Sequence, residues 1–161
     1  MNWAHIHLLL NHVPVLGTIF GLAILAYALV RRNDDLKRLA LGMFVTVGLL
    51  ALPVYFTGEP AEEAVEHVVG VSESFVKAHE AAALVSLIGV ELLGLIALVG
   101  LYLSRGGRRL SAKITRATVV VSLVTAGLMA RTANLGGQIS HAEIRAGAPL
   151  PGAEQSHDEG R

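Results

Sequence analysis

Four long apolar segments dominate this sequence and leave it few ways to fold. They cover residues 6–30, 39–57, 78–103 and 111–135, approximately. Each comes close to or exceeds the roughly 20 residues that a helix needs to cross a bilayer. Hydrophobic residues make up 53% of the chain and charged residues 16%, so no polar faces remain that would let these helices meet water. The sequence therefore predicts an all-α integral membrane four-helix bundle in residues 1–145, followed by a disordered extracytoplasmic tail in residues 146–161.

Basic residues cluster at two of the connections between these spans, and this clustering predicts the orientation. Nine of the thirteen lysines and arginines lie there: Arg31, Arg32, Lys37, Arg38, Arg105, Arg108, Arg109, Lys113 and Arg116. Short loops rich in lysine and arginine stay on the cytoplasmic side of a membrane. We therefore expect both termini and the connection over residues 58–77 to lie outside the cytoplasm.

In that orientation, the seven histidines all fall outside or in the outer third of a span. His12 lies two turns into the first span, close to the kink that Pro14 is expected to introduce, and His79 lies at the start of the third. The first and third spans also each end in a tyrosine before an arginine cluster, as two pseudo-repeated helical hairpins would. Such a repeat, with its halves related about the membrane normal, predicts that His12 and His79 face each other across the bundle.

Two imidazoles at one depth on facing helices are typical ligands of a b-type haem. Arg131, near the outer end of the fourth span, supplies a cation for the haem propionates. The sequence thus predicts a cofactor site of His12, His79 and Arg131. Its function would be electron transfer between the quinone pool and an extracytoplasmic partner, and the sequence does not decide whether the chain is an enzyme in its own right.

A transition-metal site is the alternative that the histidines and carboxylates leave open. Copper, zinc or iron would take imidazole and carboxylate ligands, and the candidates are His12, His79, His141, Glu80, Glu63 and His67. The chain has no cysteine, which excludes thiolate sites and iron–sulfur clusters. No HExxH, Walker or dinucleotide motif is present, so hydrolytic zinc and nucleotide chemistry have no support. Nucleic-acid binding has none either.

A carboxyl group in the middle of the third span, that of Glu91, needs a polar partner inside the bundle. The fourth span offers a hydroxyl stripe, and we expect a buried network of Asn11, Glu91, Thr118, Ser122 and Thr125. In a purely structural interpretation, the histidines belong to such a network and bind no cofactor. A third interpretation is a non-catalytic accessory subunit of a larger membrane complex. Gly136 and Gly137 are expected to end the fourth helix and to present His141 outside it.

Four segments of the chain resemble those of an uncharacterised family of small bacterial inner-membrane proteins with four predicted helices. They read HIHLLLNHVPVLG, YFTGEPAEEA, VKAHEAAAL and GLMARTANLGGQISHAEIR, and the likeness covers about residues 1–147. The resemblance implies the fold and a location in the bacterial cytoplasmic membrane, but no activity. It draws attention to the positions His12, Glu63, His79, Glu80, Glu91, Arg131, Asn134 and His141.

Overall fold

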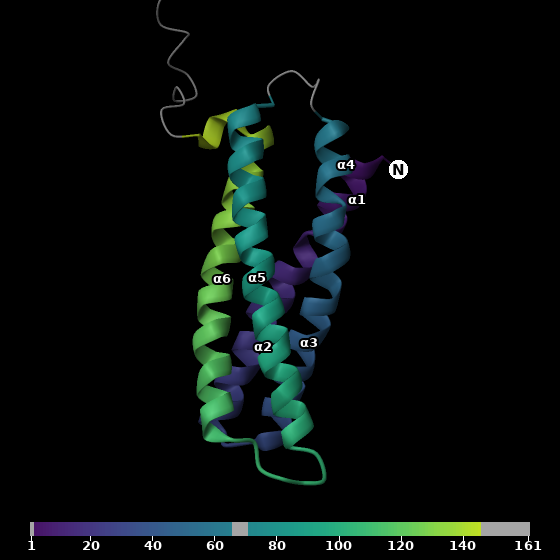
Figure 1. The fold of residues 1–161 in the computed structure, drawn as a ribbon. Helices are drawn as coiled ribbons and strands as arrows, with labels where there is room; N and C mark the ends of the chain where they lie inside the picture. The colour runs from purple at the N-terminus through teal and green to yellow at the C-terminus, as the bar shows by residue number, and fades with distance from the viewer. Residues whose placement is uncertain (1, 66–70, 146–161) are drawn as a thin grey trace, which may run out of the picture.

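The computed structural model describes residues 2–65 and 71–145, and these are helical almost throughout (Figure 1). The α-helices are α1 (Trp3–Leu10), α2 (His12–Val30), α3 (Asp34–Phe56), α4 (Gly58–Glu63), α5 (Glu73–Leu103) and α6 (Ala112–Ser140), followed by the short 3-10 helix η1 (Ala142–Ile144). The described part of the chain contains no strand. The all-α prediction is confirmed, whereas the expected tail and His67 lie outside the described residues.

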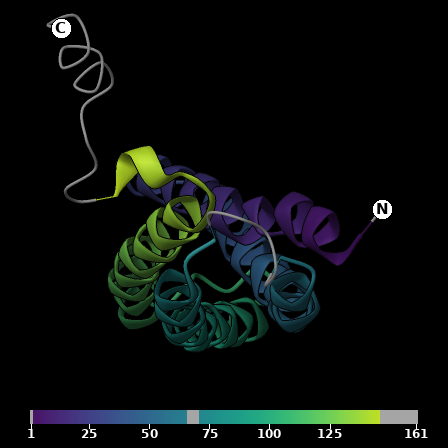
Figure 2. The same cartoon turned by 90° about the horizontal axis from the view of Figure 1, so that it is seen from above.

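Four of these helical segments are long and apolar enough to cross a membrane: Trp3–Val30, Asp34–Phe56, Glu73–Leu103 and Ala112–Ser140. Viewed from one end, the four spans surround a common core (Figure 2). Leu25, Leu41, Phe44 and Leu93 are fully buried in that core. Large apolar side chains such as Phe20 remain exposed on the outside, where lipid takes the place of water. The chain is a multi-pass membrane protein.

The bundle has two chemically different ends (Figure 1). At the arginine end, which comprises the α2–α3 turn and the α5–α6 loop, Arg38 donates hydrogen bonds to the carbonyl oxygens of Arg108 (2.8 Å) and Ser104 (3.4 Å). At the histidine end lie α1, α4, the start of α5 and the end of α6. Helices α3 and α5 cross closely between these ends, since a Cβ on Gly94 would lie 3.7 Å from the Gly48 Cα.

Near the histidine end, the sequence predicted a kink in the first helix and an early end of the fourth helix. The first span breaks at Asn11, between α1 and α2, because Pro14 has no N–H to donate to the Leu10 carbonyl; a kink there was predicted. The prediction that Gly136 and Gly137 end the fourth helix is wrong, because α6 continues to Ser140. The glycine at position 136 makes room for the imidazole of His79, which packs against α6 there.

Candidate functional site

His79 is held between α5 and α6 at the histidine end. Its Nδ1 lies 2.9 Å from the carbonyl oxygen of Thr132, and a carbonyl oxygen only accepts, so Nδ1 carries the proton. The imidazole lies against Gly136, where a Cβ would come within 3.0 Å of the His79 Cε1. Glycine at position 136 therefore makes room for the ring, which explains why α6 contains a glycine there and yet continues.

His7 approaches the same end of the bundle from α1. Its Nδ1 lies 3.0 Å from the hydroxyl oxygen of Thr57. The Thr57 hydroxyl donates its only proton to the Val54 carbonyl at 2.7 Å, so it must accept from His7. The His7 imidazole, which is partly buried, is thereby fixed against the C-terminal cap of α3.

These two imidazoles form the site that the structure supports best. Both lie at the histidine end of the bundle, His7 on α1 and His79 near the start of α5 (Figure 1). Both rings use Nδ1–H as a hydrogen-bond donor, and no hydrogen bond engages either Nε2 within the described residues. Histidines that ligate metals are usually held in this way, with the second ring nitrogen donating to a carbonyl or another acceptor. His7 and His79 are thus two histidines of the described residues whose rings are fixed by a residue from another part of the bundle.

His12 lies elsewhere. It is exposed on α2, and its Nδ1 bonds the carbonyl of Leu8 on the preceding turn at 2.8 Å. The break at Asn11 separates it from His7, which lies on α1. His7 is fixed by Thr57 at the cap of α3, whereas His12 bonds a carbonyl of its own span.

The other predicted ligands do not gather around this pair. Glu63, Glu80 and Arg131 are exposed, and no ion pair joins Arg131 to Glu80 in the described part of the chain. His141 is exposed at the end of α6 and pairs with Glu143 at 2.8 Å.

The backbone N–H of Glu143 and the His141 imidazole both bond the Glu143 carboxylate, and they lower its pKa. Within residues 2–65 and 71–145, no three histidine, aspartate or glutamate side chains come together as a metal site.

The expected polar network around Glu91 does not form either. Thr118 and Ser122 donate to the carbonyls of Ile114 and Val119 on their own helix, as hydroxyls in helices often do. Glu91 instead faces α3, where its Oε2 would lie 3.7 Å from a Cβ on Gly48. The Oε1 atom of Glu91 and the hydroxyl of Thr125 are buried without a hydrogen-bond partner. Asn11, at the break between α1 and α2, makes no side-chain capping bond.

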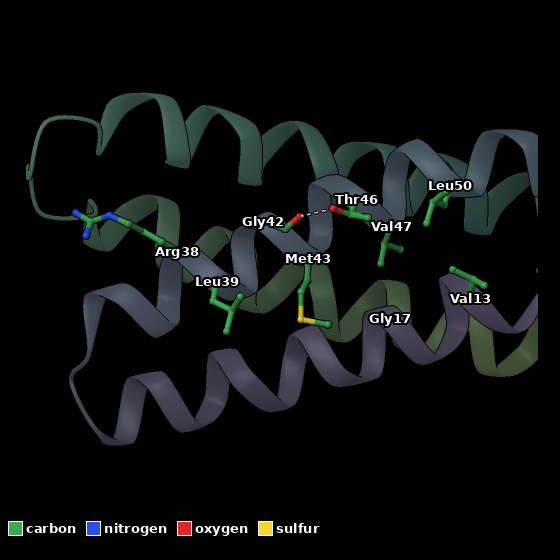
Figure 3. A pocket seen from close by; sticks show the side chains of 9 residues that line it. All are labelled: Val13, Gly17, Arg38, Leu39, Gly42, Met43, Thr46, Val47 and Leu50. Carbon is green, nitrogen blue, oxygen red and sulfur yellow. Dashed lines mark hydrogen bonds between the residues drawn. The ribbon is translucent and has the colours of Figure 1, made fainter.

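A groove of about 640 Å³ lies between α2 and α3 (Figure 3). It is lined by Val13 and Gly17 of α2 and by seven residues of α3 between Arg38 and Leu50. None of these residues belongs to the histidine site. The groove is therefore a separate feature of the molecule.

Comparison with known proteins does not assign a family or a function to the chain. No protein-family model, characterised protein or solved structure matches the chain. The resemblance to a family of small inner-membrane proteins thus stays a prediction, and the function has to be argued from the site itself.

Proposed function

We propose that this protein is a membrane redox subunit that holds a b-type haem at its histidine end, with His7 and His79 as the two axial ligands. The observation that carries the proposal is the pair of imidazoles whose Nδ1 atoms are both tied to acceptors while no hydrogen bond engages either Nε2 within the described residues. This pair replaces the predicted pair of His12 and His79.

The number of ligands favours haem over a bare metal ion. A haem iron already has four porphyrin nitrogens and needs only two side chains, whereas zinc sites take three or four protein ligands. In the described residues, no third histidine or carboxylate joins a cluster with His7 and His79. Copper, zinc or iron bound directly by the protein is therefore the weaker alternative.

The chain's own residues would orient such a cofactor and tune it. A bound haem would supply one-electron chemistry. The Thr132 carbonyl and the Thr57 hydroxyl fix the orientation of the two rings. Arg131 precedes Thr132 on α6 and is exposed, so its guanidinium is available to a propionate at the same depth.

The positive-inside rule extends the proposal to the cell. It places the arginine end in the cytoplasm and the histidine end, with both termini, on the outside of the bacterial inner membrane. Electrons would then pass between the quinone pool and an extracytoplasmic partner.

The test is the reduced-minus-oxidised absorption spectrum of the protein, purified in mild detergent from a haem-sufficient host. His7→Ala and His79→Ala should each lose the sharp b-type bands. His12→Ala is the matched control, because its ring is exposed and bonds only its own helix, and it should keep them.

Three other outcomes would contradict the proposal in different ways. Bands that vanish in His12→Ala but persist in His7→Ala would return the ligand to His12. A flat spectrum together with stoichiometric metal would favour the metal site. A flat spectrum without metal, from a protein that co-purifies with a larger complex, would favour the accessory subunit.

A further inference from the structure

Figure 3 shows the side chains of α2 and α3 that line the groove between these two helices. Its walls are apolar side chains such as Val13, Leu39 and Leu50. The hydroxyl of Thr46 is already bonded to the Gly42 carbonyl at 3.0 Å. Gly42 leaves the groove open, because a Cβ placed there would meet nothing within 4 Å. The apolar lining of the groove therefore favours an apolar ligand.

The groove has the length of one bilayer leaflet. It runs along α3 from Leu39 near the arginine end to Leu50, which corresponds to roughly 17 Å at the rise of a helix. Half of the hydrocarbon core measures about 15 Å. A single extended acyl chain of a lipid in the leaflet at the arginine end would therefore fill the groove.

The end of the groove is positively charged. Arg38 lines it there, but its guanidinium points away from the groove to the α5–α6 loop (Figure 3), where it pairs with Asp35 and bonds the Arg108 carbonyl. The turn that joins α2 to α3 adds Arg31 and Arg32, which are both exposed. Basic clusters next to membrane helices attract anionic lipid head groups.

From these observations we propose that the groove is a binding site for an anionic phospholipid. One acyl chain lies between α2 and α3, and the phosphate lies against Arg31 and Arg32. The site is distinct from the histidine pair and does not depend on a haem. Such a bound lipid would fill the groove that the side chains of α2 and α3 leave empty.

Native mass spectrometry of the full-length protein in detergent tests this site, with phosphatidylglycerol and phosphatidylcholine of identical acyl chains as probes. Wild-type protein should retain one phosphatidylglycerol in preference to phosphatidylcholine. Gly42→Leu should lose it because the side chain fills the groove. Gly127→Leu is the matched control. Gly127 likewise has nothing within 4 Å of its Cβ position, but it lies on α6, and this variant should bind as the wild type does.

A second variant tests the head group without touching the groove. Arg31→Gln combined with Arg32→Gln should weaken phosphatidylglycerol by about fivefold per arginine and leave phosphatidylcholine unchanged. Equal binding of the two lipids, or undiminished phosphatidylglycerol in Gly42→Leu, would overturn the proposal. A dimer that Gly42→Leu dissociates would also overturn it, since the groove would then hold a second copy of the chain.

Discussion

Replacing Gly136 with alanine should damage the histidine site while leaving the bundle folded. A Cβ at position 136 would lie 3.0 Å from Cε1 and 3.2 Å from Nδ1 of His79. Both distances are tighter than ordinary van der Waals contact, so the imidazole has to move away from α6. That movement lengthens the 2.9 Å bond from Nδ1 to the Thr132 carbonyl, which orients the ring.

The expected magnitudes separate stability from binding. Alanine favours a helix over glycine by about 1 kcal/mol, and the lost hydrogen bond costs about 0.5–1.5 kcal/mol. These two effects nearly cancel, so the melting temperature of the haem-free protein should change little. Losing the group that orients a metal-binding histidine typically costs about 10- to 100-fold in affinity, and haem binding to Gly136→Ala should fall by that factor.

The assay is an absorbance titration of haem into the haem-free protein in detergent, paired with a thermal melt. Gly137→Ala is the control, because its Cβ would make an ordinary 3.4 Å contact with Ile144; it should bind haem as the wild type does. Wild-type affinity in Gly136→Ala would refute the reasoning, and so would an equal loss in both variants.

Three further substitutions test the packing of the bundle through thermal unfolding or proteolysis in detergent. Glu91→Met should raise the free energy of unfolding by about 1–3 kcal/mol, because it removes a buried oxygen that has no partner; a loss of stability would reveal a partner. Gly21→Ala should lower it by about 1–3 kcal/mol, since its Cβ would lie 2.6 Å from the Phe44 ring, whereas Gly127→Ala should not lower it. Arg38→Gln should speed proteolysis of the α5–α6 loop, to which Arg38 donates hydrogen bonds; an unchanged rate would mean that these bonds do not hold the loop.

The fold could be predicted because its strongest determinant acts locally. Each span is a continuous apolar run that must be helical to satisfy its own backbone in lipid, and this requirement does not depend on how the helices pack. The break near Asn11 could be predicted for the same reason, since Pro14 removes one hydrogen bond within its own helix.

The site could be predicted only in part, because it depends on the direction in which each side chain points. His7 and His12 lie close together in the first span, and their spacing does not say which of them is fixed by another helix. Gly136 was expected to break a helix because the ring that packs against it comes from 57 positions earlier in the chain. Glu91 points to α3 instead of the hydroxyl stripe on α6, and hydropathy carries no information on that choice.

The most direct test of the haem proposal is imidazole rescue of the His7→Gly variant, with His12→Gly alongside. The account predicts that His7→Gly loses the low-spin bis-histidine spectrum and that free imidazole, entering the space left by the side chain, restores it. His12→Gly should show the wild-type spectrum without imidazole. A wild-type spectrum in untreated His7→Gly would contradict the assignment of His7 as an axial ligand, and with it the site proposed for this protein.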